Sequence, residues 1–211
     1  MTPGELLGDA LARVVAVDRV WIVLDKAVRV HSQPDVERGG KSLVDALVQT
    51  GARPHVVHRL DYDTSGLIVY ALDRGAAKTL SAAFAAHAPQ RTYRALLAVP
   101  LAVGAAGVID APLYTSGGRS RVAPGGERAV THWRVERESP IPGTSELVLR
   151  LETGRTHQIR VHLAHALSPV LGDTKYGGPP FERLALHAAE LVLDHPVTGK
   201  TCRFVSGIPW G

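Results

Sequence analysis

Short apolar runs of strand length recur along the chain and limit the folds open to it more than any other feature. They are bounded by glycine, proline and polar turn residues, as is usual for β-strands. The runs are WIVLD (21–25), LIVYAL (67–72), RTYRALLAV (91–99), RAVTHWRVER (128–137) and ELVLRLE (146–152). The last two alternate apolar and polar residues, so each strand is expected to bury one face.

Helical patterns are fewer than strand patterns. Residues 4–16 predict a short amphipathic helix, residues 78–87 an alanine-rich helix, and a third helix is expected from about Thr156. Strands and helices do not alternate regularly, which argues against a repeated βαβ fold. The sequence therefore predicts an α+β domain with a mixed, largely antiparallel sheet and flanking helices.

The length and the cysteine content indicate a single soluble domain in a reducing compartment. A chain of 211 residues suits one domain, and Cys202 has no second cysteine with which to form a disulfide. No apolar run approaches the roughly 20 residues that a membrane-spanning helix needs. The N-terminus carries Glu5 and Asp9 and lacks the basic start of a signal peptide. We expect a cytoplasmic protein.

The net charge of +4 is concentrated in the middle of the chain. Residues 91–160 hold ten basic and six acidic side chains, whereas basic and acidic residues balance in the rest of the sequence. Nineteen of the 24 basic residues are arginine, which binds phosphate in bidentate fashion and stacks on bases. A GC-rich genome also favours arginine, so composition permits an RNA partner without establishing one.

The first segment with chemical potential is VVHRLDYDTSGLIVYAL (56–72), in which a polar cluster leads directly into a strand. A loop attached to a rigid strand holds reactive side chains in fixed positions. Asp61 lies between Arg59 and Asp63, so neighbouring charges can tune its ionisation. An ordinary turn explains the same residues, and Ser65 lacks the G-x-S-x-G context of a nucleophilic serine.

The second segment is LETGRTHQIRVHLAHAL (151–167), where a polar turn leads into a helix. Ile159 and Leu163 fall on a helix face that can pack on the core. Arg160 falls on another face beside the small Ala164, so we expect an accessible guanidinium there. It could pair with a carboxylate from elsewhere in the chain, or be an ordinary solvated arginine.

A third, weaker signal is the start of the strand RTYRALLAV. Tyr93 lies between Arg91 and Arg94, so it could stack on a base while the guanidinium groups hold phosphates. A tyrosine at this place in a core strand is an equally good interpretation.

No cofactor or metal is expected. His157, His162 and His165 lie at helical angles of about 0°, 140° and 80°, so they diverge around the helix. The sequence has no H-E-x-x-H motif or paired cysteines. The glycine pairs in GGRS and PGGE lack a nucleotide-binding pattern.

Taken together and in this order, these segments resemble the RluA class of RNA pseudouridine synthases. HRLDYDTSGL resembles the family's H-R-L-D-x-x-T-S-G-L segment, RTYRALL its K/R-x-Y-x-A segment, and TGRTHQIRVH its G-R-x-H-Q-I/L-R-x-H segment. WIVLDKAVRVH is similar to the first strand and loop, and GDTKYGG followed by LHAAELVLDHP to the C-terminal block. The resemblance covers residues 20 to 207.

The resemblance implies a role for five residues. Asp61 corresponds to the catalytic aspartate and Arg59 to the arginine that flips the base. Tyr93 corresponds to the active-site tyrosine, Arg160 to the arginine that pairs with the aspartate, and Leu186 to a small apolar wall near the target base.

The resemblance also implies a bent, mixed, largely antiparallel sheet and an isomerase acting on ribosomal or transfer RNA. It implies that residues 1–211 are a single catalytic domain without a separate N-terminal RNA-binding domain, and that the protein is a monomer with RNA as partner and no membrane or metal. A catalytically inactive RNA-binding protein of the same fold is the alternative, and a hydrolase using the His and Asp residues is a third reading. The sequence departs from the family at Ala27, where proline is common, and at Tyr62, where a basic residue is common.

The chemistry of the family explains these residues. Isomerisation breaks the carbon–nitrogen glycosidic bond of uridine and rejoins the ring through carbon 5, without redox change or net hydrolysis, so no cofactor is needed. Asp61 could attack the sugar, attack the ring, or remove a proton beside the anomeric carbon. A guanidinium at Arg160 would favour the ionised carboxylate. Flipping the base costs a few kcal/mol, which stacking by Arg59 and Tyr93 would offset.

Overall fold

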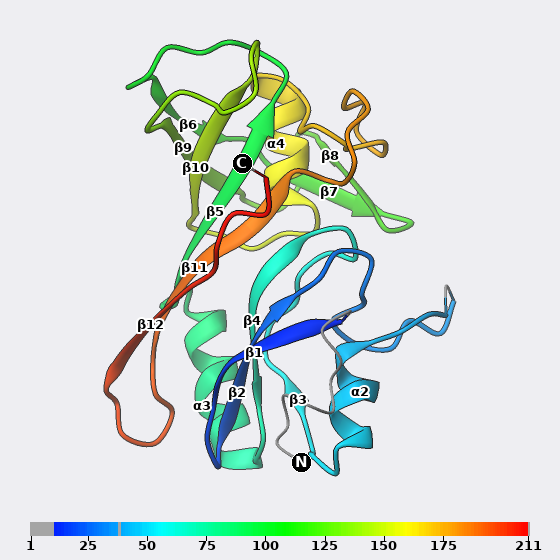
Figure 1. The fold of residues 1–211 in the computed structure, drawn as a ribbon, viewed down its shortest axis with the longest axis vertical. Coiled ribbons are helices and arrows are strands. Elements are labelled where there is room, and N and C mark those ends of the chain that lie inside the picture. Colours follow the sequence, from blue (N-terminus) through cyan, green and yellow to red (C-terminus); the bar gives the residue numbers. More distant parts are fainter. Residues whose placement is uncertain (1–10, 38, 211) are drawn as a thin grey trace. The chain divides into compact units, whose positions relative to one another are not determined.

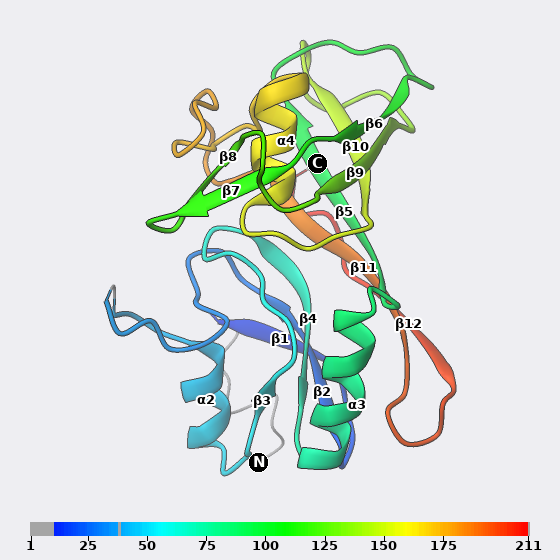
Figure 2. The same cartoon turned by 180° about the vertical axis from the view of Figure 1, so that it is seen from behind.

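The computed structural model describes residues 11–37 and 39–210, which divide into two compact units (Figures 1 and 2). The first unit contains the described residues up to Gln90 together with Ala188–Gly207. The second contains Arg91–His187 and the chain from Ile208. Among the described residues, no helix is long and apolar enough to cross a membrane.

The first unit is built on strands in the order β1-β2-β4-β11. Their bounds are Ala12–Val17 for β1, Trp21–Lys26 for β2, Ser65–Ala71 for β4 and Leu186–Asp194 for β11, of which the part from Ala188 belongs to this unit. β3 (His55–Val56) pairs with β4, and β12 (Thr201–Val205) pairs with β11. All seven residues of β4 are buried, as expected for a central strand.

Two helices belong to this unit. α3 (Arg74–Ala85) lies beside β2 and β4 in both views (Figures 1 and 2). Its Ala76 and Leu80 pack in one core cluster with strand residues Trp21, Val23, Leu67, Val69, Ala71, Leu191 and Leu193. α2 (Leu43–Gln49) begins after Ser42, whose side-chain oxygen accepts a hydrogen bond from the Asp45 backbone N–H.

The second unit contains strands in the order β5-β10-β9-β6. Their bounds are Gln90–Leu97 for β5, of which the part from Arg91 belongs to this unit, Ser145–Leu151 for β10, Val130–Val135 for β9 and Ala106–Asp110 for β6. These pairs are antiparallel, and Leu149 of β10 lies between Tyr93 and Trp133 on its two neighbours. β7 (Leu113–Ser116) and β8 (Arg119–Val122) form a separate two-stranded sheet, which lies near α4 (Gln158–Ala166) in both views.

The predicted α+β class is confirmed: helices flank a mixed, largely antiparallel sheet. The helix expected over residues 78–87 starts earlier, because the Asp73 side chain accepts from the Ala76 N–H and caps α3. The helix expected over residues 4–16 is wrong where it is described, because ARVVAV forms β1 and pairs with β2. Its valines favour a strand. Residues 4–10 lie outside the described residues. α2 was not expected from the sequence.

Candidate active site

Asp61 lies in the loop between β3 and β4 of the first unit, and its side chain is half-buried. Its backbone oxygen accepts from the Thr64 N–H at 3.1 Å, which closes a turn directly before the buried Ser65. Arg59, two residues earlier, is exposed. Gly66 has a φ of +109°, and a Cβ added there would overlap the backbone of Ala188 on β11. The glycine of the T-S-G part of the motif is therefore required by close strand packing.

A buried lysine holds the backbone on one side of Asp61. Lys26 is 1% exposed, and its ammonium donates to the carbonyls of Ala27 at 3.0 Å, Val30 at 2.9 Å and Tyr62 at 3.3 Å. The Arg29 N–H donates to the same Tyr62 carbonyl at 2.8 Å. Ala27, which replaces the common proline, thus lies in a loop whose carbonyls are bound to one ammonium group.

Ser32 holds the backbone on the other side of Asp61. Its hydroxyl donates to the Leu60 carbonyl at 2.8 Å and accepts from the Leu60 N–H at 3.1 Å. The Tyr70 hydroxyl donates to the Ser32 carbonyl at 2.6 Å, and burial raises the pKa of this hydroxyl. The backbone groups of Leu60 and Tyr62 are both bound to other segments. The backbone that carries the Asp61 side chain is therefore held in place.

His58 has a structural position in the same motif. Its Nε2 accepts from the Val69 backbone N–H at 3.0 Å, and its ring stacks on Phe84 at 4.3 Å. Accepting through Nε2 places the ring proton on Nδ1. The histidine thus binds a strand N–H of β4 beyond the two-residue pairing with β3.

Tyr62 replaces the basic residue common in the family and forms an aromatic pair with His31. The two ring centroids are 4.5 Å apart, and Tyr62 is 37% exposed. Tyr62 directly follows Asp61 in the chain.

Tyr93 of the second unit is buried on β5, and Leu186 is buried at the start of β11. The flanking Arg94 pairs with Glu136 at 2.8 Å and Glu146 at 3.4 Å, so these carboxylates neutralise it. Arg91 lies against Gly154, and its Nε has no hydrogen-bond partner among the described residues.

The turn before α4 is fixed by buried Gln158. Its amide donates to the Val130 carbonyl at 3.0 Å and the Thr131 hydroxyl at 3.1 Å, while its oxygen accepts from the Thr153 hydroxyl at 2.7 Å and the Arg155 N–H at 3.0 Å. These bonds join β9, the end of β10 and the first turn of α4. The hydrogen bonds of Gln158 therefore fix the N-terminal end of α4, the helix that the sequence predicts from about Thr156.

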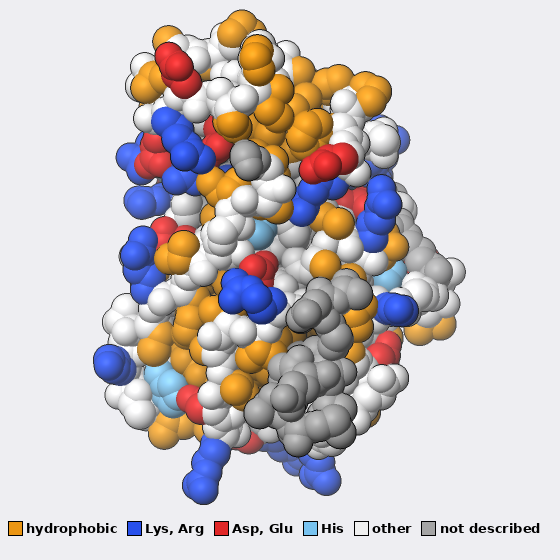
Figure 3. Space-filling view, in the orientation of Figure 1, with side chains coloured by type: hydrophobic (Ala, Val, Ile, Leu, Met, Phe, Trp, Pro, Cys, Tyr) orange, Lys and Arg blue, Asp and Glu red, His pale blue; other side chains and the backbone are white. Residues whose placement is uncertain are grey.

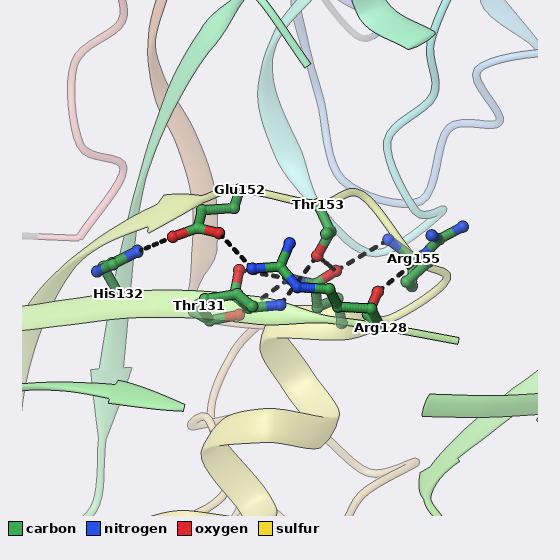
Figure 4. Close-up of polar contacts among 8 residues, drawn as sticks. Arg128, Thr131, His132, Glu152, Thr153 and Arg155 are labelled. Carbon is green, nitrogen blue, oxygen red and sulfur yellow. Dashed lines mark hydrogen bonds and ion pairs between the residues drawn. The ribbon is translucent and has the colours of Figure 1, made fainter. Parts of the chain in front are cut away.

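Figure 4 shows a neighbouring polar network, in which His132 lies on β9, Arg128 precedes β9 and Glu152 follows β10. Glu152 lies between His132, at 2.8 Å, and Arg128, at 2.9 Å. Hydrogen bonds from His132 and then Arg128 lower the pKa of the Glu152 carboxyl. Arg128 is in this way neutralised by an acidic partner.

Arg160 is 3% exposed, which corrects the expectation of an accessible guanidinium. Its Nε and Nη2 donate to the two carboxylate oxygens of Asp173, each at 2.7 Å, and its guanidinium lies 5.2 Å from the centre of the Tyr176 ring. Ala164 does not expose the arginine, because the segment with Asp173 and Tyr176 covers it. The expected carboxylate partner from another segment is present in Asp173. The pairing with Asp61 that the resemblance implies stays a prediction.

Two of the three histidines of this segment, His157 and His162, form hydrogen bonds within the fold. His157 has a φ of 54°, and its Nδ1 lies 2.7 Å from the Tyr176 hydroxyl. His162 is buried between the Thr131 hydroxyl and the Ala111 carbonyl. Burial lowers the pKa of the His162 ring. Within residues 11–37 and 39–210, no group of three or more His, Cys, Asp or Glu side chains could hold a metal ion.

A groove of about 620 Å³ lies elsewhere in the second unit, over β6, β9 and β10. Tyr93 is aligned across the strands with Leu149, Trp133 and Gly107. Most of the residues that line the groove are one position before or after these, so their side chains lie on the opposite face of the sheet from Tyr93. These residues are Ala106, Val108, His132, Arg134, Val148 and Arg150. The groove is therefore separate from the residues that the motifs single out.

Comparisons with known proteins agree with the motif order. The family model of RNA pseudouridylate synthase matches residues 20–165. Ribosomal large subunit pseudouridine synthase D of Vibrio cholerae is 36% identical over 95% of this chain and 68% of its own length. The protein of the same name from Zymomonas mobilis is 37% identical over 95% of this chain and 70% of its own length.

Solved structures show the same fold. Human RNA pseudouridylate synthase domain containing 1 aligns with a TM-score of 0.79 and 25% identity over 99% of this chain and 87% of that one. Human RNA pseudouridylate synthase domain containing 4 aligns with a TM-score of 0.75 and 23% identity over 98% of this chain and 92% of that one.

Proposed function

The chain belongs to the RNA pseudouridine synthase family and is an isomerase, and from this premise we propose that Asp61 supplies the catalytic carboxylate for isomerising uridines of ribosomal RNA. The observation that carries the proposal is the position of Asp61 in the matched segment, on a loop bound on both sides by Lys26 and Ser32. A fixed backbone lets one carboxylate meet a substrate atom without reorganisation.

The reaction balances without a co-reactant. The N1–C1′ bond of uridine breaks, a C5–C1′ bond forms, and the proton lost from C5 is matched by a proton gained at N1. The carboxylate of Asp61 either forms a transient bond to the sugar or the ring or takes a proton beside the anomeric carbon. All three routes need an ionised carboxylate.

The remaining motif residues receive supporting roles in the proposal. Arg59, which is exposed beside Asp61, fills the stack that the target base leaves. Tyr93 and Leu186 bound the uracil while it turns, and Arg160 pairs with the carboxylate of Asp61. Because Arg160 already binds Asp173 in bidentate fashion, its guanidinium is held in one orientation.

Ribosomal RNA is the proposed substrate because two relatives are named ribosomal large subunit pseudouridine synthase D. They are 36% and 37% identical to this chain over most of its length. Transfer RNA is the alternative substrate. A cytoplasmic location and a monomeric state belong to the same proposal, and the lone Cys202 suits a reducing compartment.

Mapping pseudouridine in cells tests this proposal. RNA from cells with the gene, without it, and with Asp61→Asn or Asp63→Asn is compared at every uridine. We expect at least one large-subunit site to be lost without the gene and with Asp61→Asn but retained with Asp63→Asn. Sites lost only from transfer RNA would overturn the substrate, and a site retained with Asp61→Asn would overturn the catalytic assignment.

A further inference from the structure

The two-stranded sheet of residues 113–122, here named the ribbon, has two unlike faces. Its turn is Gly117–Gly118, both with positive φ, which suits a tight hairpin between twisted strands. Leu113 and Ser120 are buried on the inner face. The outer face carries four exposed side chains, Tyr114, Ser116, Arg119 and Arg121. No acidic residue occurs in the ribbon.

The inner face attaches the ribbon to the start of α4. Leu113 packs with Ala129 and Val161, and the Ser120 hydroxyl donates to the Thr156 carbonyl at 2.7 Å. The Ser120 N–H donates to the Tyr176 hydroxyl at 3.0 Å. The ribbon is therefore a supported element, and its outer side chains have a defined position.

The outer face presents guanidinium groups that aromatic rings support. Arg121 lies 5.2 Å from the centre of the Tyr114 ring, and Tyr114 is 50% exposed. Arg119 lies 5.5 Å from the centre of the Tyr176 ring and donates to the Lys175 carbonyl at 2.7 Å. A guanidinium that contacts a ring keeps N–H groups for a phosphate, and Arg119 keeps those that do not donate to Lys175.

Arg119 and Arg121 differ from most other arginines in residues 91–160, which form ion pairs. Five arginines there pair with glutamates, namely Arg94, Arg128, Arg134, Arg137 and Arg155. In the described part of the chain, Arg119 and Arg121 lie within 4.0 Å of no carboxylate. Basic and acidic side chains are also intermixed over the face drawn in Figure 3. The ribbon thus retains positive charge that is neutralised elsewhere.

We propose that the outer face of the ribbon binds the RNA strand beside the target uridine, with Arg119 and Arg121 on phosphates and Tyr114 stacked on an unpaired base. The inference rests on the proposed function for the identity of the ligand. Tyr176 contacts both Arg119 and Arg160, at 5.5 and 5.2 Å, so the ribbon is joined to a residue of the candidate site through one ring. Phosphate contacts of this kind set affinity and register without reading sequence.

The test compares Arg119→Gln/Arg121→Gln with the control Arg150→Gln. Arg150 is also exposed and without an ion pair among the described residues, but it lies on the sheet face opposite to Tyr93. Affinity for a ribosomal RNA fragment is measured at several salt concentrations on the Asp61→Asn background, so that turnover is not required. Losing two phosphate contacts should lower the slope of log affinity against log salt by about 1.4–1.8.

A stacking contact is tested separately with Tyr114→Phe and Tyr114→Ala. Only the alanine variant should weaken binding, by roughly tenfold, on a substrate with an unpaired flank. In the active enzyme, we expect the loss in the double arginine variant to fall on KM and to vanish with a minimal substrate that lacks the flank.

An unchanged salt slope in the double variant, or an equal change in Arg150→Gln, would overturn the ribbon proposal while leaving catalysis by Asp61 intact. Absence of pseudouridine formation by the wild-type protein, with a normal salt slope, would instead overturn the proposed function.

Discussion

Gly66 occupies a position at which any side chain would meet the neighbouring strand. Its Cβ would overlap the backbone of Ala188, whereas a Cβ on Gly51, which has a φ of +85°, would meet nothing within 4 Å. Gly51→Ala should therefore cost only the backbone strain, about 1 kcal/mol. Gly66→Ala should cost roughly 2–4 kcal/mol, because β11 must also shift. Urea unfolding of both variants measures the difference, and equal losses would contradict the close approach.

The sequence singled out Asp61 and Arg160 but did not reveal the ammonium that holds the backbone beside Asp61 or the carboxylate that binds Arg160. Lys26 looked like an ordinary strand end, since nothing in a sequence shows that an ammonium is buried under three carbonyls. Asp173 lies in a loop, and a loop has no hydrophobic periodicity from which its position could be predicted. Its bidentate bond to Arg160 could therefore not be anticipated. Contacts between segments distant in sequence are invisible to periodicity.

Among the secondary-structure elements, the start of α4 depends most on a single buried amide. Gln158→Leu removes four hydrogen bonds and leaves partners on β9 and β10 unsatisfied. We expect a loss of roughly 2–4 kcal/mol in the free energy of unfolding. Gln49→Leu, on the exposed side of α2, is the control and should change stability little. A small loss for Gln158→Leu would show that water replaces these bonds.

Strands were predicted better than helices because their signals differ in strength. LIVYAL is almost wholly buried, and ELVLRL alternates apolar and polar residues except at Val148, which leaves few alternatives to a strand. ARVVAV fits both an amphipathic helix and an edge strand, and its pairing with β2 decides the outcome. β7 and β8 carry few apolar residues, so their sheet follows from the Gly117–Gly118 turn and the contacts of Ser120 more than from hydrophobicity.

For the whole molecule, the lowered pKa of the buried His162 ring predicts how the free energy of unfolding depends on pH. Its pKa is lowered from 6.5, by burial first, with a further contribution from the charge of His165, while the Ala111 carbonyl and Asp110 act in the opposite direction. The unfolded state therefore binds protons first as the pH falls below about 6.5, so stability should decrease on acidification.

Thermal unfolding between pH 5 and 7 tests this dependence. His162→Gln should flatten the profile, whereas the exposed His87→Asn should leave its slope unchanged. Equal slopes in all three proteins would contradict a lowered pKa at His162.

The expectation that residues 1–211 form a single catalytic domain stays a prediction.

Release of tritium from ribosomal RNA labelled at uracil carbon 5 measures the proposed reaction itself, because the C5 proton leaves when the new carbon–carbon bond forms. We predict steady release by the purified wild-type protein and by Asp63→Asn, and none by Asp61→Asn, although all three bind the RNA. Release by Asp61→Asn at the wild-type rate would contradict catalysis by this carboxylate.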